Sequence, residues 1–207
     1  MRKSKFITLV LIVLLTLLPV VSVTMMYHIT QCKAIEGMAN GYFGDSYTLC
    51  SVDDSIKNRD VVMQAVDDIK ARVAIYMTKQ YGKNKVNAIY YNKQFVNFPM
   101  RYGHFFTKEE LKCGKNMAVV GKNLEGKIKE QDGYKYIKVK DEYFRVIGII
   151  GYDSETIIDD YIYISVKQAD GIIDSDLCTL DIWGKETGAE DQFTEELSES
   201  GVLAEQR

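Results

Sequence analysis

The sequence predicts an α+β protein in which an N-terminal transmembrane helix is followed by a two-lobed extracytoplasmic domain. Three observations lead to this prediction. One uncharged, apolar stretch stands at the N-terminus, whereas the rest of the chain is mixed and polar. Segments with strand-like and helix-like periodicity alternate after that stretch. A region rich in short strands separates two strand–helix units, which indicates a βαβ-like lobe that carries a β-rich inserted lobe.

The apolar stretch Phe6–Tyr27 contains no charged residue. As a helix it is roughly 33 Å long, which is enough to cross a bilayer. Arg2, Lys3 and Lys5 precede it and no acidic residue lies within it or before it, and positive flanks stay on the cytoplasmic side. We therefore expect a single-pass plasma-membrane protein with a cytoplasmic N-terminus, held in lipid by this helix, with its bulk outside the cytoplasm.

A cleaved signal peptide is the alternative, because a charged start and an apolar middle fit both descriptions. The residues Ser22–Thr24 are a poor substitute for the small-residue cleavage site that signal peptidase requires. The residues Ile29–Gln31 before Cys32 also differ from a lipid-attachment motif. These observations favour an uncleaved anchor.

The outer part of the chain is acidic. Without Arg2, Lys3 and Lys5 it has 23 basic residues against 29 acidic ones, a net charge of −6. Such a balance argues against nucleic acid as a partner and against electrostatic binding to anionic lipid. Only two prolines occur and no repeat is present, so the outer part is expected to be ordered.

Four cysteines are widely spaced, at Cys32, Cys50, Cys113 and Cys178. No C-x-x-C motif occurs, which argues against a zinc site. An exported domain could pair the four in any of three connectivities. The alternative is that they remain free and behave as small buried hydrophobic residues.

The first lobe begins with a predicted strand at Tyr47–Val52, after an exposed lead. A helix is expected from Lys57 to about Tyr81, ended by Gly82, and a second strand at Val86–Tyr91. This helix is predicted because apolar residues recur at three- and four-residue steps: Val62, Val66, Ile69, Val73, Tyr76 and Met77. Strand, helix and strand together form a βαβ-like or split βαβ unit.

The middle of the chain is rich in predicted strands. Thr107 and Glu110 form a capping-box pattern that opens a short helix through Leu111. Four strands are expected after it, the second and third forming a hairpin: Met117–Gly121, Tyr134–Lys140, Tyr143–Gly151 and Tyr161–Val166.

The last part resumes the first pattern. Cys178–Trp183 is strand-like, and Thr187–Glu190 is a second capping box. That box is expected to open a helix to about Ser200, with Gly201 as its end.

These elements give the expected domain division. Residues 1–27 form the cytoplasmic tail and transmembrane helix, and residues 28–45 form a juxtamembrane segment. Residues 46–92 and 176–207 together form the βαβ-like lobe. Residues 93–175 form the β-rich inserted lobe.

Four segments resemble one known family, in family order. Tyr102–Glu110 (YGHFFTKEE) is similar to a G-R-F-F-T-x-x-D/E signature, and Met117–Gly121 (MAVVG) to a V-A-V-L/I-G strand. Tyr143–Gly148 (YFRVIG) is similar to x-F-x-V-I/V-G, and Asp160–Ile164 (DYIYI) to D-x-V-Y/F-I-P. The chain thus resembles the MacB-like periplasmic core domain of FtsX/MacB-type ABC-transporter permeases.

Departures from the family pattern leave two alternatives. The D-P-I/V-G-K turn between the second and third motifs is absent, and Ser165 stands where a proline is usual. No apolar run able to cross lipid follows Val166, although such permeases usually carry three further spans there. The chain is therefore either cut before those spans or a free-standing single-pass relative.

The resemblance implies a mechanical function. In such permeases the outer domain is non-catalytic and relays motion, or binds a partner or substrate, in export driven by a separate cytoplasmic ATPase. The implied partners are that ATPase subunit, other permease segments, and an extracytoplasmic protein or peptide. No P-loop motif occurs in this chain. The alternative is a single-pass membrane sensor or adhesion module.

No catalytic, cofactor-binding or metal-binding residues are predicted. The two histidines, His28 and His104, have no second ligand at metal spacing, and a solvent-facing or packed histidine is expected. The acidic pairs at 53–54, 67–68 and 159–160 are expected to be caps or solvated surface. An anchored hydrolase is the third hypothesis, but no nucleophile motif supports it.

Tyrosine is frequent, with fourteen residues. On a β-rich lobe, six of them could form a contact patch for a partner or peptide, and ordinary strand packing is the alternative: Tyr134, Tyr136, Tyr143, Tyr152, Tyr161 and Tyr163.

Overall fold

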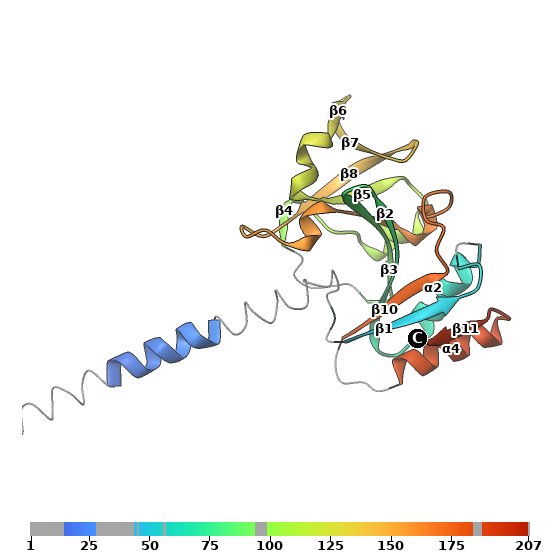
Figure 1. Cartoon of the computed structure of the whole chain (residues 1–207), viewed down its shortest axis with the longest axis horizontal. Coiled ribbons are helices and arrows are strands. Elements are labelled where there is room, and N and C mark those ends of the chain that lie inside the picture. The colour runs from blue at the N-terminus through green and yellow to red at the C-terminus, as the bar shows by residue number, and fades with distance from the viewer. Residues whose placement is uncertain are drawn as a thin grey trace, which may run out of the picture.

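The computed structural model describes residues 15–27, 44, 46–55, 57–93, 99–183 and 188–206 (Figure 1). The strands are β1 (Ser46–Val52), β2 (Arg72–Tyr81), β3 (Asn84–Tyr91), β4 (Met100–Gly103), β5 (Met117–Gly121), β6 (Lys129–Gln131), β7 (Tyr134–Val139), β8 (Glu142–Ile150), β9 (Tyr161–Ser165), β10 (Leu177–Trp183) and β11 (Ala204–Gln206). The helices are α2 (Arg59–Asp68), α3 (Lys108–Lys112) and α4 (Ala189–Glu199), with 3₁₀ turns η1 (Lys122–Lys127), η2 (Ile157–Asp160) and η3 (Val166–Gln168).

The strands form one sheet in the order β11-β1-β10-β2-β3-β9-β5-β8-β7-β6, with β4 paired to β8. The mixed α and β composition agrees with the predicted fold class. Residues 15–27 are helical and their side chains are exposed. Within the described residues, no helix combines the length and the apolar character needed to cross a bilayer. Much of the expected span Phe6–Tyr27 lies outside the described residues, so the transmembrane helix stays a prediction.

One end of the sheet consists of two interleaved βαβ units. The strands β1 and β2 are both antiparallel to β10, so they are parallel to each other with β10 between them. By the same reasoning β10 and β11 are parallel with β1 between them. This is the split βαβ arrangement. Helices α2 and α4 pack together beside these strands (Figure 1), and they bury apolar side chains that include Val62, Val66, Phe193 and Leu197.

The predicted helix from Lys57 to Tyr81 is wrong beyond Asp68. The helix α2 ends there, Ile69 has an extended backbone with ψ 130°, and β2 follows. The physical reason is that Val73–Met77 is buried on both faces of the sheet. A continuous apolar run of this kind matches a helical period by coincidence, because strands buried on both faces do not alternate. Gly82 lies in the turn between β2 and β3 at φ +59°, a conformation that glycine adopts without strain.

Several predicted elements are confirmed. The strand β5 has the expected bounds, and β7 and β8 form the expected hairpin. Thr107 caps α3 in a capping box, since the Glu110 backbone N donates to Thr107 Oγ1 at 3.2 Å and the Thr107 backbone N donates to Glu110 Oε2 at 2.8 Å. The predicted second capping box depends on Thr187, which lies outside the described residues. Helix α4 begins at Ala189, with Gly188 at its N-cap position and no side-chain cap.

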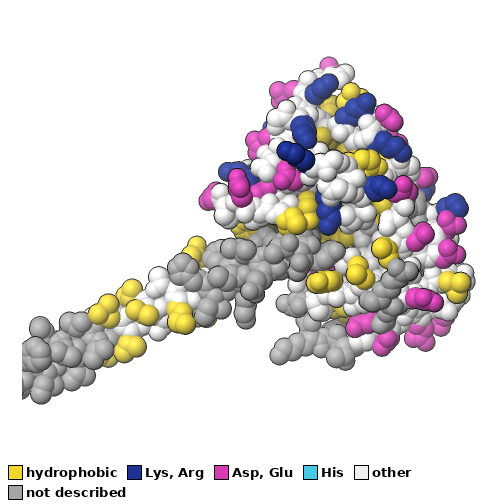
Figure 2. Space-filling view, in the orientation of Figure 1, with side chains coloured by type: hydrophobic (Ala, Val, Ile, Leu, Met, Phe, Trp, Pro, Cys, Tyr) yellow, Lys and Arg dark blue, Asp and Glu magenta, His cyan; other side chains and the backbone are white. Residues whose placement is uncertain are grey.

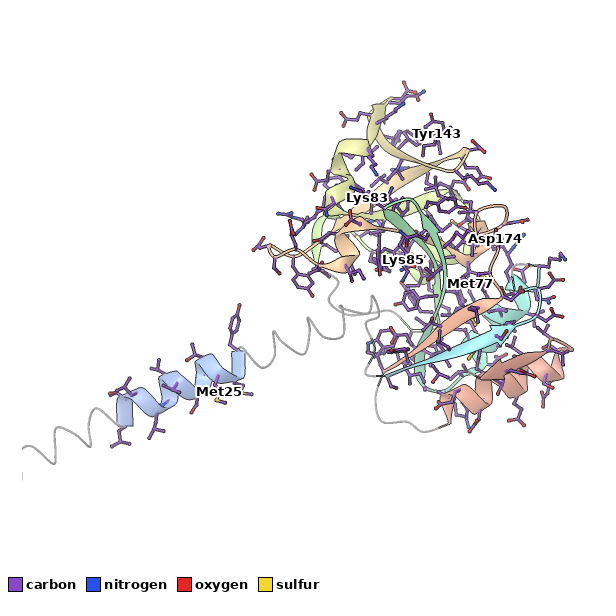
Figure 3. All side chains as sticks on the ribbon, in the orientation of Figure 1. Met25, Met77, Lys83, Lys85, Tyr143 and Asp174 are labelled. Atoms are coloured by element: carbon purple, nitrogen blue, oxygen red, sulfur yellow. The ribbon has the colours of Figure 1, made fainter. Side chains whose placement is uncertain are left out.

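The strands β3 and β9 join the two ends of the sheet in parallel, from Lys85 opposite Tyr161 to Ile89 opposite Ser165. The ammonium of Lys85 lies 5.0 Å from the centre of the Tyr161 ring, and burial lowers the pKa of Lys85 (Figure 3). One hydrogen-bonded sheet therefore contains strands from both expected lobes. The division into 46–92 with 176–207 and into 93–175 stays a prediction.

The core around this junction is aromatic. Phe105 forms edge contacts with Phe106 and Tyr163, each with ring centres 5.6 Å apart. The hydroxyl of Tyr91 donates to the Phe106 carbonyl. Phe106, Tyr91 and Tyr163 are almost completely buried. The segment that precedes α3 is thus anchored between β3 and β9.

Candidate functional site

The described residues contain no cluster of three metal-ligating side chains. His104 is about half exposed and its Nε2 lies 3.0 Å from Glu110 Oε1, in a surface ion pair. His28 and Cys32 lie outside the described residues. The features of the described residues with most bearing on function are polar links between elements and one exposed aromatic surface.

A cluster of charged side chains connects α2 to α3, and we call it the Asp67 clamp. Lys108 Nζ lies 2.7 Å from Asp67 Oδ1, and Lys112 Nζ lies 2.7 Å from Asp67 Oδ2. The hydroxyl of Tyr90 on β3 donates to Asp67 Oδ2 at 2.9 Å. Helix α2 belongs to the expected βαβ-like lobe and α3 to the expected inserted lobe. The clamp therefore joins segments from the two parts of the predicted division.

The clamp shifts the ionisation of its members. Burial acts to raise the pKa of Asp67, but the hydrogen bonds from Lys108, Lys112 and Tyr90 outweigh it and lower that pKa. Burial is the main cause that raises the pKa of Tyr90 to about 12. The Asp67 hydrogen bond raises the pKa of Lys112. At neutral pH Asp67 is therefore ionised, the Tyr90 hydroxyl is protonated and Lys112 is positively charged.

Asn92 strengthens the same junction at the end of β3. Its Nδ2 donates to the carbonyls of Ile69 at 2.9 Å and Ala71 at 2.7 Å, and its Oδ1 accepts from the Val73 backbone N at 3.1 Å. Lys108 Nζ also donates to the Asn92 carbonyl at 3.0 Å. The α2–β2 connection, β3 and α3 are thus held together by buried and half-buried polar contacts.

A second feature is the outward side of the β7–β8 pair, formed by Tyr134, Tyr136, Lys138, Tyr143 and Arg145. We call it the hairpin face. Tyr136 is opposite Arg145 and Lys138 is opposite Tyr143, so these side chains share one side of the sheet. Arg145 stacks over the Tyr134 ring at 4.2 Å. Tyr134 and Tyr143 are 46% and 51% exposed.

The opposite side of the same strands is buried, as shown by Ile137, Val139 and Phe144. The hairpin face lies at the upper end of the molecule, where Tyr143 is labelled (Figure 3). Figure 2 shows basic and acidic side chains interspersed there, whereas acidic side chains predominate at the lower end, where α4 carries five acids. The hairpin face is thus an exposed surface that combines three tyrosines with the basic side chains Lys138 and Arg145.

The predicted six-tyrosine patch is wrong for two of its members. Tyr161 is 3% exposed and Tyr163 is completely buried, because both lie on the central strand β9. They serve strand packing, which was the alternative interpretation. Tyr152 is half-buried outside the β7–β8 pair. The remaining three tyrosines belong to the hairpin face.

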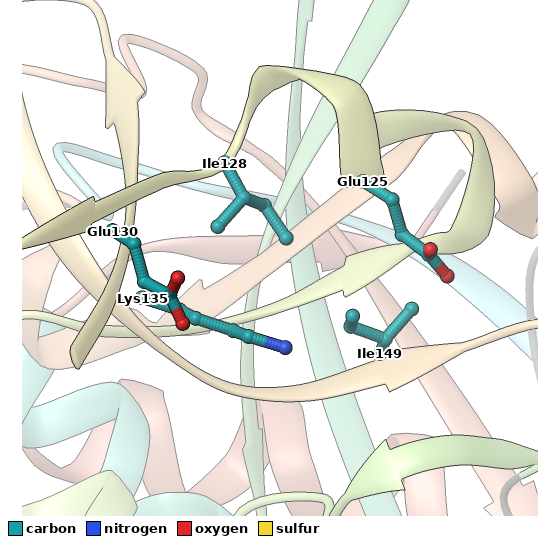
Figure 4. Close-up of a pocket in the computed structure, with 5 residues that line it drawn as sticks. All are labelled: Glu125, Ile128, Glu130, Lys135 and Ile149. Carbon is teal, nitrogen blue, oxygen red and sulfur yellow. The ribbon is translucent and has the colours of Figure 1, made fainter. Parts of the chain in front are cut away.

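A small polar pocket lies beside the hairpin, on the other side of β7 (Figure 4). Its volume is about 310 Å³, and Glu125, Ile128, Glu130, Lys135 and Ile149 line it. The ammonium of Lys135 also lies 4.1 Å from the centre of the Tyr102 ring. The lining is open and mixed in charge, with two acidic and one basic side chain beside two isoleucines.

The acidic pairs have different surroundings. Asp54 forms an exposed ion pair with Lys57 at 2.9 Å, as expected for surface. Asp159 is a cap, since the Thr156 backbone N donates to Asp159 Oδ2 at 2.7 Å. It is also completely buried, with Lys122 Nζ at 3.2 Å. The clamp function of Asp67 was missed, because its partners lie far away in the sequence.

Comparisons with known proteins identify relatives of the chain. The model of the family described as the MacB-like periplasmic core domain matches residues 9–199. Among solved structures, the periplasmic region of MacB from Actinobacillus actinomycetemcomitans is similar over 83% of this chain and 91% of that one, at 13% identity and a TM-score of 0.49. The extracellular domain of the noncanonic ABC-type transporter YknZ from Gram-positive bacteria is similar over 77% and 100%, at 13% identity and a TM-score of 0.46. No curated protein matches the chain.

Proposed function

The chain belongs to the family of MacB-like periplasmic core domains, and from this membership we propose that it is the extracytoplasmic domain of an ABC-transporter permease-like membrane protein. In this proposal it catalyses no reaction. It relays motion, or engages an extracytoplasmic protein or peptide, in export driven by a separate cytoplasmic ATPase. The helix Phe6–Tyr27 would hold it in the plasma membrane beside other permease segments, with the N-terminus in the cytoplasm.

The observation that carries the proposal is the pairing of β1 with β11, the first and last strands of the described residues. In antiparallel register, Cys50 is opposite Gln206 and Val52 is opposite Ala204. The strand β11 therefore runs back toward the end of the sheet at which β1 begins. A displacement applied at either end of the domain acts on two neighbouring, hydrogen-bonded strands, as a relay of membrane motion requires.

The interior supports the transmission of such a displacement. One sheet runs from β11 at one edge to β6 at the other, and the Asp67 clamp links α2 to α3 beside β3. Close-packed interiors transmit strain because they deform little. Movement of β1 and β11 would thus reach the hairpin face as movement of one body.

The hairpin face supports the second part of the proposal, contact with a partner. Tyrosine and arginine are enriched where proteins bind one another, because they combine apolar area with polar groups. Here three tyrosines and Arg145 lie together on a paired strand surface whose reverse side is packed. A rigid surface of this kind loses little conformational entropy on binding.

The test is affinity purification of the tagged full-length gene product from membranes. The proposal expects an ABC ATPase subunit to co-purify in stoichiometric amount, with ATP hydrolysis in the eluate. A product that carries no ATPase under conditions that preserve membrane complexes would contradict it. Reading the gene past codon 207 distinguishes the permease from the alternative, a single-pass sensor or adhesion module. The alternative predicts a stop codon there, whereas three further apolar runs would indicate a permease.

A further inference from the structure

Two of the four cysteines face each other across neighbouring strands. Cys50 on β1 is directly opposite Cys178 on β10 in antiparallel register. Both carry free thiols in this structure and both are almost completely buried, at 0% and 1% exposure. Leu49 beside Cys50 is exposed, whereas Val52 is buried, so the two thiols lie on the buried side of the sheet.

The Cα separation of this pair lies within the range that a disulfide bridges, and the Cβ atoms, about 4.5–5.5 Å apart in directly opposed residues, must approach by roughly 1 Å when the bond forms. The Val52 backbone N donates to the Asp176 carbonyl at 2.7 Å, and hydrogen-bonded and non-bonded pairs alternate along an antiparallel ladder. The Cys50–Cys178 pair, two residues further along, is therefore a hydrogen-bonded pair with Cα atoms about 5.5 Å apart. Disulfides bridge Cα separations of roughly 4.4 to 6.8 Å, most often near 5.5 to 6 Å.

The two sulfur atoms already interact. The hydrogen bond between the thiols is the main cause that lowers the pKa of Cys50, against the opposing effect of burial. The same hydrogen bond, together with burial, raises the pKa of Cys178. The two thiols are thus hydrogen-bonding neighbours in the folded protein, as partners of one disulfide must be.

We propose that Cys50 and Cys178 form a disulfide in the exported protein, joining β1 to β10. The inference rests on the proposed location outside the cytoplasm, where disulfides persist. Cys113 is not an equivalent candidate, because it is exposed at the end of α3 and its Sγ donates to the Glu110 carbonyl at 3.1 Å. Cys50 and Cys178 thus select one of the three connectivities that the sequence leaves open.

The reaction needs a disulfide oxidant, a protein or small molecule with an exchangeable disulfide. One of the two cysteines, as the thiolate, attacks one sulfur of the oxidant, and the other sulfur of the oxidant leaves as a thiolate. The second cysteine thiolate then attacks the Sγ of the first in the mixed disulfide, and the oxidant is released with both of its sulfurs reduced to thiols. Two protons and two electrons pass from the two cysteines. Because both thiols are buried in the fold, this exchange precedes the packing of β1 against β10.

The bond would protect the relay that we propose. The strand β1 follows the N-terminal segment and receives force from it, and a covalent link prevents it from peeling away from β10. The link also closes a loop that contains the whole expected inserted lobe, and closure of a long loop restricts the unfolded chain most. Extension of the chain under force would then stop at the cross-link.

The test uses the full-length chain with Cys32→Ser and Cys113→Ser, so that Cys50 and Cys178 are the remaining thiols. Cells are quenched in acid, and the denatured protein is treated with a maleimide–polyethylene glycol before and after reduction. The proposal expects no adduct before reduction and two afterwards. Adding Cys50→Ser to this background should give one adduct in both conditions. Peptide mapping of the unreduced wild-type chain should identify the Cys50–Cys178 link without any substitution.

Two adducts before reduction, or a mapped link from Cys32 or Cys113 to either residue, would overturn the proposal. Oxidation of the purified chain, refolded in a glutathione redox buffer, then identifies the cause. If the bond forms there but not in cells, the proposed location has failed together with the inference. If it does not form there, the geometry argument has failed and the proposed function is unaffected.

Discussion

Lys112 Nζ lies 2.7 Å from Asp67 Oδ2, although 45 positions and three strands separate the two residues in the sequence. With Lys108 and Tyr90, this contact joins α2 to α3 and so links parts of the chain that flank the β2–β3 hairpin. A relay requires such links, because otherwise the two ends of the long sheet could twist independently.

Replacement of Asp67 should loosen this link. We expect Asp67→Asn to lower the free energy of unfolding by about 1–2 kcal/mol, because two lysines and a tyrosine lose a charged acceptor at a partly exposed site. Asp68→Asn is the matched control, since Asp68 follows directly in the chain and accepts an exposed hydrogen bond from Gln64 at 2.9 Å. Urea unfolding followed by circular dichroism compares the two. If both variants lost the same free energy of unfolding, the Asp67 clamp would have no specific stabilising effect.

The clamp should also make stability depend on pH. The pKa of Asp67 is lowered in the folded protein, so its contribution is present above the unfolded pKa of about 3.9 and is lost as the pH falls through the lower folded value. We expect the stability difference between wild type and Asp67→Asn to be constant from pH 7 to pH 5 and to shrink below about pH 4. A difference that is unchanged at pH 2 would contradict this explanation.

Gly121 lies where β5 passes close to η2. A Cβ on Gly121 would overlap the backbone carbonyl of Asp159, which cannot move aside as a flexible side chain does. We expect Gly121→Ala to destabilise the protein by about 1–3 kcal/mol, as overpacking of a core does. Gly126→Ala is the control, because its Cβ would meet no atom within 4 Å. The thermal unfolding midpoint should fall only for the first variant.

The hairpin face should matter for binding and not for folding. We expect Tyr143→Ala to leave the free energy of unfolding within about 0.5 kcal/mol of wild type, as usual for surface positions. In cross-linking on intact membranes, the same variant should lose at least about fivefold in capture of an extracytoplasmic partner. Tyr47→Ala, an exposed tyrosine on β1 at 49% exposure, is the control. Equal capture by both variants would locate the contact elsewhere.

Periodicity in the sequence was enough to predict the strands that alternate or lie between clear turns. The hairpin of β7 and β8, the strand β5 and the capped helix α3 are examples. The strand β2 was mistaken for helix because Val73–Met77 is buried on both sides and shows no alternation. The short strands β4, β6 and β11 were missed, since three or four residues carry too little pattern.

The contacts that define the candidate sites depend on register and could not be predicted. The partners of Asp67 become visible only when α2 and α3 are placed beside β3. The facing of Cys50 and Cys178 requires the β1–β10 register, which no local pattern encodes. The tyrosines of β9 are buried because both sides of that strand are covered, whereas those of the β7–β8 pair lie on a side that faces solvent. The sequence alone does not distinguish these two environments.

The most direct test of the central claim is the side of the membrane on which Cys113 lies. Its thiol is exposed, whereas Cys50 and Cys178 are buried. In the full-length protein with Cys32→Ser, a membrane-impermeant maleimide added to intact cells should label Cys113, and the further substitution Cys113→Ser should abolish that labelling. Labelling that appears only after the cells are lysed would place the domain in the cytoplasm and contradict the account.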